Sequence, residues 1–408
     1  MSPTSITVRM YNVGFGDCFL LTFHYANQDR HMLVDFGSAA APRYGPRDYL
    51  RRVAQDIARQ TKGKLHIVVA THRHRDHLNG FATDGLGTGK IIAGLKPDHV
   101  ILPWTEDPRA APDARAAASN SYTGGKPDAK IAARFLATLD DMQSFAASVV
   151  GLGDMPESTR KQLQFLGEDN IKNPSAVENL MNMGKRGKAW YVNAGMTLNR
   201  LLPGVKITVL GPPTLRQSDS IRAQRVKDPR EFWQFSNQWA SHRRAPKPSS
   251  KAPKTGAESP PNVRWFIEQT RRIHADQMLE LVRELDAVLN NTSVILLIEA
   301  GNRKLLFPGD AQIENWAYAL RNPEWRKLLA DVDLYKVGHH GSLNATPKSL
   351  WRLFRHKGGE KQQDRLMSLC STRSGKHGNA RLGTEVPRRA LVEELRKNSA
   401  FVSTEEHG

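Results

Sequence analysis

The feature that most constrains this chain is a run of histidines placed directly after an apolar segment. Residues 65–70 are apolar and rich in β-branched side chains, which predicts a short buried strand. The sequence Thr71-His72-Arg73-His74-Arg75-Asp76-His77 follows it at once. Four potential metal ligands therefore follow the end of one rigid element.

The spacing of these ligands predicts where they point. Alternate residues of an extended segment share a face, so we expect His72 and His74 to reach one metal ion together. Asp76 and His77 come where the chain turns into a helix, and we expect them to point at a neighbouring position. The alternative is an exposed loop rich in histidine and arginine, which the two interleaved arginines would suit.

Further candidate ligands also follow predicted strands. Asp310 ends the sequence Pro308-Gly309-Asp310 after an apolar run, and a carboxylate at a strand end can bridge two metal ions. His339 and His340 follow the apolar run at 334–337 and precede Gly341. Each signal is weak alone, but together they predict a metal site at one end of a sheet.

The order of elements predicts an α/β protein with two sheets and helices packed outside them. We expect strands at residues 6–13, 18–24, 31–36, 65–70, 100–103, 205–210, 293–299, 304–307 and 334–337. We expect helices at residues 47–60, 132–149, 277–288 and 313–320. The length of 408 residues would allow two or three domains, but the motifs spread along the chain favour one domain over 1–408 with insertions at 106–126 and 214–261.

The charge balance indicates a polyanionic partner. The chain has 59 Lys and Arg against 41 Asp and Glu, a net charge of +18, and such a chain concentrates nucleic acid or another phosphate-rich partner near its surface. The insertion at 214–261 is basic and partly flexible in composition. The insertion contains three aromatic residues, Trp233, Phe235 and Trp239. We expect their rings either to stack on nucleic-acid bases or, alternatively, to anchor a surface helix. The alternative for the whole charge is a solvated basic surface.

The remaining composition indicates a soluble, cytoplasmic protein. Cys18 and Cys370 are the two cysteines, too few for a zinc ribbon or a disulfide framework, which indicates a reducing compartment. The N-terminus lacks a basic stretch followed by an apolar one, so we expect no signal peptide. No apolar run approaches the roughly 18 residues of a membrane helix, so we expect no membrane partner.

The histidine run resembles the HxHxDH signature of the metallo-β-lactamase superfamily. Within that superfamily the chain is most similar to the hydrolase domain of the ComEC/Rec2 DNA-uptake proteins. The similarity spans nearly the whole chain, interrupted by insertions. The matching pieces are the segments at residues 12–18, 33–37, 72–77, 290–293, 307–310, 336–342 and 374–378.

The resemblance implies an αββα sandwich, a four-layer fold, with two divalent metal ions, Zn²⁺ or Mn²⁺, between the sheets. By position, His72 and His74 would bind the first ion, and Asp310 would bridge. Asp76, His77 and one of His339 and His340 would bind the second ion. We favour His340, because the glycine after it matches the His-Gly pattern of the superfamily.

The chain departs from many superfamily members just before the hairpin that leads to Asp310. Where they supply another histidine, this chain reads Asn290-Asn291-Thr292-Ser293, as the ComEC-like group does. Asn290 and Asn291 are therefore candidates for a first-site ligand or a substrate contact. An asparagine carbonyl is a harder ligand than imidazole, which favours Mn²⁺ over Zn²⁺ or leaves that site weakly filled. The chain also lacks membrane spans, so it is not itself an uptake channel.

The predicted activity is metal-dependent hydrolysis, in first place by a phosphodiesterase or nuclease. Asp76 would orient the attacking water as well as bind metal, and His377 would protonate the leaving oxygen or hold a phosphate. The alternative for His377 is an ordinary loop histidine. Lys336 and Ser342 are candidate phosphate contacts, with structural roles as the alternative.

Two other functions remain open at this point. One is hydrolysis of a small non-nucleotide substrate such as a lactone, a thioester or a β-lactam, since the fold does not determine the chemistry. The other is a non-catalytic nucleic-acid-binding module with a decayed site. The basic charge gives no support to the small-substrate hydrolase, and the intact set of candidate ligands disfavours the non-catalytic module.

Overall fold

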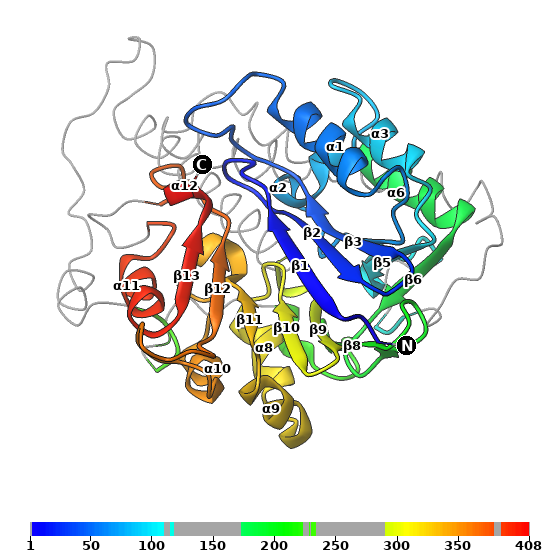
Figure 1. Cartoon of the computed structure of the whole chain (residues 1–408). Helices are drawn as coiled ribbons and strands as arrows, with labels where there is room; N and C mark the ends of the chain where they lie inside the picture. The colour runs from blue at the N-terminus through cyan, green and yellow to red at the C-terminus, as the bar shows by residue number, and fades with distance from the viewer. Residues whose placement is uncertain are drawn as a thin grey trace, which may run out of the picture.

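Two mixed β-sheets with helices packed against them form this α/β protein (Figure 1). The structure is a computed structural model, and it describes residues 2–109, 115–117, 173–222, 228, 230–233, 290–378 and 385–407. All statements below concern these residues.

The first sheet has six strands in chain order. The first three pair antiparallel and the rest pair parallel. The strands are β1 (Ser5–Met10), β2 (Cys18–His24), β3 (Asp29–Phe36), β4 (Ile67–Val69), β5 (His99–Pro103) and β6 (Lys188–Val192). The parallel strands β3 and β4 thus end at the same edge, where the histidine run begins.

The second sheet has seven strands in the order β13-β12-β11-β10-β9-β8-β7. Strands β10 to β13 run parallel, and β7 to β10 pair antiparallel. Their bounds are β7 (Thr197–Leu198), β8 (Val205–Gly211), β9 (Ile295–Ala300), β10 (Arg303–Phe307), β11 (Leu334–Lys336), β12 (Met367–Cys370) and β13 (Ala400–Ser403). The carboxyl ends of β10, β11 and β12 therefore lie side by side.

Alternation of apolar residues along the strands builds one core between the sheets. Phe19 of β2 and Phe307 of β10 meet there edge to face, with ring centroids 5.6 Å apart. The next residue along β2, Leu20, points to the opposite side of its sheet. Both faces of each sheet are thus apolar, and each outer face needs a cover.

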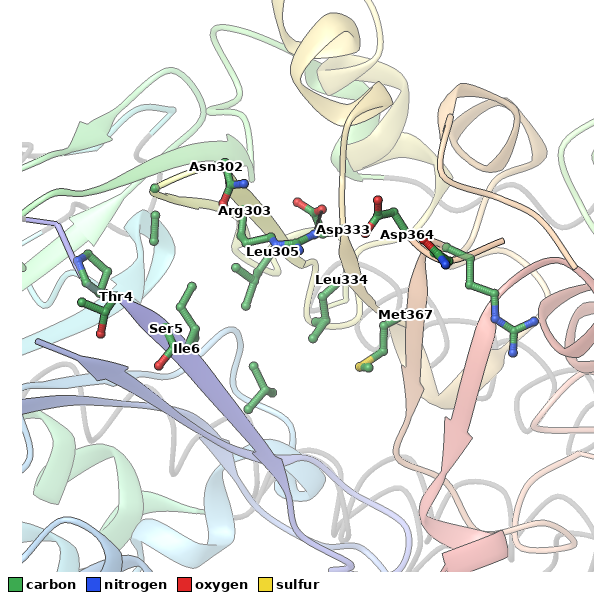
Figure 2. Close-up of a pocket in the computed structure, with 16 residues that line it drawn as sticks. Thr4, Ser5, Ile6, Asn302, Arg303, Leu305, Asp333, Leu334, Asp364 and Met367 are labelled. Carbon is green, nitrogen blue, oxygen red and sulfur yellow. Dashed lines mark hydrogen bonds and ion pairs between the residues drawn. The ribbon is translucent and has the colours of Figure 1, made fainter. Parts of the chain in front are cut away.

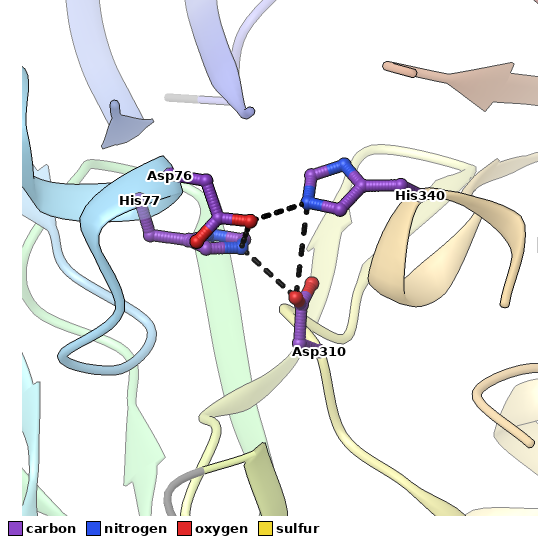
Figure 3. Close-up of side chains that lie close together, drawn as sticks. All are labelled: Asp76, His77, Asp310 and His340. Carbon is purple, nitrogen blue, oxygen red and sulfur yellow. Dashed lines mark hydrogen bonds and ion pairs between the residues drawn. The ribbon is translucent and has the colours of Figure 1, made fainter. Parts of the chain in front are cut away.

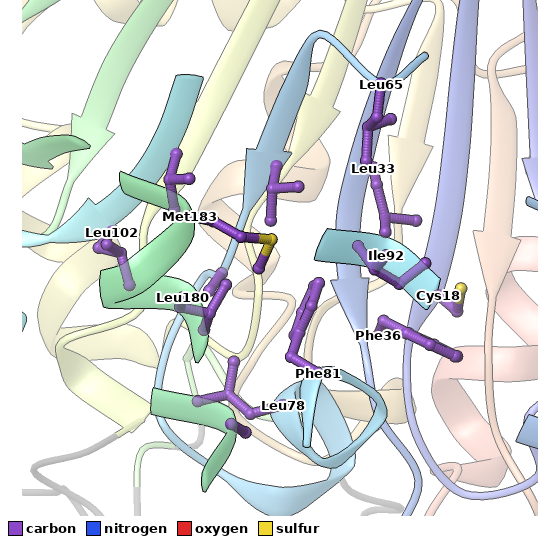
Figure 4. Packing of buried hydrophobic residues seen from close by; sticks show 14 of the residues in the cluster. Cys18, Leu33, Phe36, Leu65, Leu78, Phe81, Ile92, Leu102, Leu180 and Met183 are labelled. Atoms are coloured by element: carbon purple, nitrogen blue, oxygen red, sulfur yellow. The ribbon is translucent and has the colours of Figure 1, made fainter. Parts of the chain in front are cut away.

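Helices cover the outer face of the first sheet (Figure 4). They are α1 (Tyr49–Gln60), α3 (Thr88–Gly94) and α6 (Pro174–Arg186). In α1 the buried residues Leu50, Ala54 and Ile57 fall on one helical stripe, as an amphipathic helix requires. The short α2 (Arg75–Leu78) contains the end of the histidine run.

Further helices cover the outer face of the second sheet. They are α8 (Ile313–Ala319), α9 (Pro323–Ala330), α10 (Lys348–Leu353) and α11 (Arg389–Asn398), with the short α12 (Thr404–His407) after β13. The start of α9 is specified locally, since the Asn322 side chain accepts hydrogen bonds from the backbone N–H groups of Glu324 and Trp325.

Most expected elements that fall on described residues are confirmed within a few positions. The first strand ends at Met10 instead of residue 13, because Val13 N–H already bonds to the Tyr11 carbonyl and Gly14 turns the chain at φ 82°. The sequence did not predict α3, α6, α9 to α12, β6, β7, β12 or β13. The helices expected at 132–149 and 277–288, and most of the insertions at 106–126 and 214–261, lie outside the described residues.

Of the three aromatic residues named above in the basic insertion, the structure describes Trp233. Its indole N–H donates to the Thr346 carbonyl at 2.6 Å, and its ring packs against the core of the second sheet. That placement favours the anchoring role over base stacking. Phe235 and Trp239 lie outside the described residues. None of the helices in the described ranges is long and apolar enough to cross a membrane.

Candidate metal centre

The three sets of predicted ligands come together at the carboxyl ends of their strands. The histidine run follows β4, Asp310 follows β10, and His340 follows β11. Figure 3 shows Asp76 and His77 from α2 facing Asp310 and His340 from the other sheet. The site thus lies where the ends of the two sheets meet.

Asp76, His77, Asp310 and His340 form the best-defined group. Their ligand atoms all lie within 4.8 Å of one another, and all four residues are buried. His340 Nε2 is 2.9 Å from Asp76 Oδ2, and His77 Nε2 is 3.0 Å from Asp310 Oδ2. Two ligands of one tetrahedral zinc ion are about 3.4 Å apart. The group therefore has the dimensions of a metal site.

His72 approaches the same carboxylate from another side, and His74 lies next to His72. His72 Nε2 is 3.1 Å from His74 Nδ1 and 3.9 Å from Asp310 Oδ2. The His72 and His77 rings are 4.2 Å apart between centroids. Asp310 thus lies between His72 and the best-defined group, as a bridging ligand would.

Several ligand atoms of this centre are buried without a hydrogen bond. Asp310 Oδ2, Asp76 Oδ1 and His77 Nε2 make none with any described residue, although the first and last face each other. Leaving such groups unsatisfied costs about 1–3 kcal/mol each, and more when they are charged. Carboxylate and imidazole are the ligands that Zn²⁺ and Mn²⁺ accept. The four residues of the best-defined group therefore fit a divalent cation, and His72 and His74 place two more imidazoles beside it.

The two innermost histidines are oriented by acceptors behind them. His77 Nδ1 donates to Asp35 Oδ2 at 2.8 Å, and His340 Nδ1 donates to the Ser371 carbonyl at 2.9 Å. Asp35 is itself fixed by the backbone N–H and the hydroxyl of Thr71, both at 2.7 Å. Each ring consequently presents Nε2 to the centre, the arrangement that metal-binding histidines adopt.

The close approach of three segments makes this geometry possible. A Cβ atom at Gly37 would lie 2.5 Å from the backbone of Arg75, Asp76 and His77. Only glycine lets the end of β3 lie that close to α2. The position of Gly37 thus brings Asp35 within reach of His77.

No protein-family model matches this chain, and no curated protein matches it.

Lys336 lies inside the centre. Its ammonium group is 2% exposed, forms a short ion pair with Asp17, and lies 3.4 Å from Asp310 Oδ1. It also donates to the Gly309 carbonyl at 3.1 Å. Of the two roles expected for Lys336, this placement favours the structural one, because its charge is already paired with the carboxylates of Asp17 and Asp310.

The charges of the cluster shift one another's pKa values. Burial opposes the charge on His77 and His340, but the surrounding carboxylates (Asp310 and Asp35 for His77, Asp17 and Asp310 for His340) raise the pKa of both imidazoles. Burial likewise opposes ionisation of Asp310, and His77 most strongly lowers its pKa well below the usual range. The carboxylates thus favour the protonated forms of His77 and His340, which add to the positive charge of Lys336.

The two histidines after β11 differ in position. His340 is fully buried, whereas the side chain of His339 is 27% exposed, with Nε2 3.9 Å from Asp310 Oδ2. The backbone N–H of His339 donates to Asp310 Oδ1 at 3.1 Å. His340 is therefore the more buried of the two candidate ligands, and His339 is partly exposed to solvent. Ser342 is buried and bonds to Asn344 at 3.4 Å.

His377 lies beside the centre. The Phe15 ring is 4.4 Å from both the His340 and the His377 rings, measured between centroids. Burial lowers the pKa of His377 to about 4, so this imidazole is neutral at pH 7. A neutral imidazole donates a hydrogen bond or accepts a proton more readily than it protonates a leaving oxygen.

The two asparagines before β9 point to different partners. Asn291 Nδ2 donates to Glu314 Oε2 at 3.3 Å. Asn290 is buried, and its Oδ1 makes no hydrogen bond with any described residue. The segment is tied to the histidine run, since Val294 N–H donates to the Thr71 carbonyl at 2.9 Å. The Oδ1 atom of Asn291 is buried in the same way, so both asparagines remain candidates for a ligand or a substrate contact.

Several residues of the centre were not predicted as site residues: Phe15, Asp17, Asp35 and Ser371. Asp17 and Asp35 lie in segments that carry the resemblance, and Asp35 is an acid at a strand end followed closely by Gly37. That is the same signal that identified Asp310. Ser371 contributes a backbone carbonyl, which no side-chain pattern reveals.

A groove of about 710 Å³ lies at the other end of the second sheet (Figure 2). Ile6 of β1 faces Leu305, Leu334 and Met367 across it, and the last three belong to the amino ends of β10 to β12. It contains none of the candidate ligands. The site is therefore located by the convergence of its ligands and not by this groove.

Proposed function

We propose that the protein is a metal-dependent phosphodiesterase or nuclease of the metallo-β-lactamase superfamily, similar to the ComEC-like hydrolase domain. In this proposal the two sheets and their outer helices are the αββα sandwich of that superfamily. The observation that carries it is the buried convergence of His72, His74, Asp76, His77 and His340 on Asp310.

The residues divide into two sets of ligands. His72, His74 and Asp310 would hold one Zn²⁺ or Mn²⁺ ion, with Asn290 or Asn291 as the candidate further ligand. Asp76, His77, His340 and Asp310 would hold the other. When bound, two such cations lower the pKa of a water molecule and offset negative charge that develops on a phosphoryl group.

The protein side chains supply orientation and charge balance. Asp76 keeps Oδ1 without a hydrogen bond in the described structure, so this oxygen is free to orient the attacking water. Asp35 and Ser371 hold the histidine rings, and Lys336 offsets part of the charge of Asp17 and Asp310. His377, being neutral, would donate a hydrogen bond to a phosphate oxygen or the leaving group.

The net charge of +18 supports a nucleic-acid substrate over a lactone, thioester or β-lactam. A buried set of four imidazoles and two carboxylates with oriented rings supports a metal-dependent enzyme over a non-catalytic nucleic-acid-binding module. Cys18 and Cys370 are both buried free thiols, which supports a cytoplasmic location as part of the same proposal.

The test is cleavage of single- and double-stranded DNA and RNA by metal-stripped protein resupplied with Mn²⁺, Zn²⁺ or Mg²⁺. Asp310→Asn preserves shape but removes the bridging charge, so it should lower metal content and reduce cleavage by at least about 10²-fold. Glu324→Gln, on the exposed start of α9, is the matched control and should behave as wild type. Full metal content with no cleavage of any nucleic acid would exclude the nuclease and favour the small-substrate hydrolase.

A further inference from the structure

An aromatic side chain is held in solvent on the loop between β3 and α1. Tyr44 exposes 85% of its surface, against 40% for Leu86 and 42% for Met367, the other exposed large apolar residues of the described ranges. A single exposed tyrosine is ordinary on a protein surface. What distinguishes Tyr44 is that its loop contacts residues next to the metal centre.

The loop that carries Tyr44 is tied to the wall of the metal centre. Phe15 N–H donates to the Ala40 carbonyl at 2.8 Å, and Ala39 N–H donates to the Phe15 carbonyl at 2.7 Å. The Phe15 ring contacts His340 and His377. One residue, Phe15, thus connects the base of the Tyr44 loop with a candidate metal ligand.

A second loop, residues 371–377, lies against the first. Arg373 donates to the Ala41 carbonyl, and Arg43 donates to the Ser374 carbonyl at 3.3 Å. Figure 1 shows the segment between β3 and α1 reaching toward α12, where Arg43 pairs with Glu405 at 3.1 Å. A pocket of about 110 Å³ between the loops is lined by Arg43, Tyr44 and Arg373, among others.

The second loop carries two cations, Arg373, which lines this pocket, and Lys376. Burial raises the pKa of the Tyr49 hydroxyl, and the charges of Arg75, from the histidine run, and Arg373 oppose that shift. Lys376 is exposed on the second loop. Glu405 offsets the charge of Arg43, and Arg373 and Lys376 are the cations of the second loop at residues 371–377. The surface of Tyr44, Arg373 and Lys376 is called the Tyr44 surface below.

We propose that the Tyr44 surface binds a single-stranded segment of nucleic acid that leads into the metal centre, with a base on the Tyr44 ring and phosphates at Arg373 and Lys376. A single strand fits because an exposed ring can stack only on a base whose face is free, and a duplex covers those faces. The inference rests on the proposed function for the fate of the strand, but not for its binding.

The test is binding of the full-length, metal-loaded protein to a fluorescent 20-nucleotide phosphorothioate oligonucleotide, which keeps the charges and bases but resists cleavage. Tyr44→Ala should weaken the Kd about five- to 150-fold, because stacking on an aromatic side chain contributes that much per base. Tyr44→Phe keeps the ring and should stay within about twofold of wild type. Leu86→Ala is the control for loss of an exposed apolar residue elsewhere and should leave binding unchanged.

The outcomes separate this inference from the proposed function. Wild-type affinity in Tyr44→Ala, an equal loss in Tyr44→Phe, or equal losses on the duplex of the same sequence would each overturn the inference. Wild-type cleavage of bis(p-nitrophenyl) phosphate, measured in parallel, tests the hydrolase alone. If the protein hydrolyses this substrate but Tyr44→Ala binds the oligonucleotide like wild type, the proposed function holds and the inference about the Tyr44 surface is wrong. If binding depends on Tyr44 but no hydrolysis occurs, the inference holds and the proposed function is wrong.

Discussion

At the scale of single residues, the centre depends on side chains that lie behind the candidate ligands. Asp35 is the main example, because it accepts three hydrogen bonds, from Thr71 N–H, the Thr71 hydroxyl and His77 Nδ1. It holds one backbone segment and one ring at once. Its own φ of 54° is an uncommon conformation for a residue other than glycine, and these hydrogen bonds hold it there.

We predict that Asp35→Asn lowers metal affinity by about 10- to 100-fold without unfolding the protein. The amide still accepts one hydrogen bond, but it lacks the charge that fixes His77 with Nε2 toward the centre. Competition with a chromogenic chelator measures the affinity. Asp48→Asn removes an exposed carboxylate that pairs with Arg52 and should leave affinity unchanged. Equal affinity in wild type and Asp35→Asn would mean that His77 needs no such support.

At the scale of elements, the sequence pattern predicted those strands that are specified by their own residues. Residues 18–24 and 295–300 are long apolar runs, and both are strands nearly as expected. β12 and β13 have four residues each and lack a repeated alternation, so their pairing with β11 specifies them and the sequence pattern does not. Asp35 and His77 are 42 positions apart, and no periodicity carries such a contact. The ligand run was predictable because its members are neighbours in sequence.

The junction of β3 and β4 gives a prediction at this scale. His66, just before β4, accepts a hydrogen bond from His31 N–H through Nδ1 at 3.0 Å and so extends the pairing of the two strands. Burial, reinforced by Arg30, lowers the pKa of His66 to about 4. At pH values between about 4 and 6.5, His66 is therefore protonated in the unfolded chain but not in the folded one. The free energy of unfolding consequently falls as pH drops from about 6.5 toward 4.

We expect this one group to cost about 2 kcal/mol of unfolding free energy between pH 7 and pH 4.5. His66→Asn keeps an acceptor in the place of Nδ1 but does not titrate, so its stability should fall by that much less over the same range. Urea unfolding of both proteins at the two pH values gives the difference, in which the other histidines cancel. Identical pH dependence of the two proteins would show that His66 is protonated as easily in the folded state as in the unfolded one.

At the scale of the whole molecule, a net charge of +18 has two explanations that contacts alone do not separate. A diffuse basic surface attracts any polyanion, and every exposed cation contributes a similar small share. A dedicated path concentrates the effect in the few cations that touch the strand. The two differ in how the salt dependence of binding responds when particular charges are removed.

We predict that replacing Arg373 and Lys376 by glutamine lowers the slope of log K against log salt by about 1.4, since each phosphate contact to a single strand contributes about 0.7. The control removes two charges of the same kind at Arg321 and Arg326, which are exposed next to and on α9, at the opposite end of the molecule from α12 (Figure 1). Its slope should equal that of wild type. Anisotropy titrations of the phosphorothioate oligonucleotide between about 50 and 200 mM salt measure all three slopes. If both double variants lose the same amount, the charge acts as a diffuse field, and the strand follows no defined path to the metal centre.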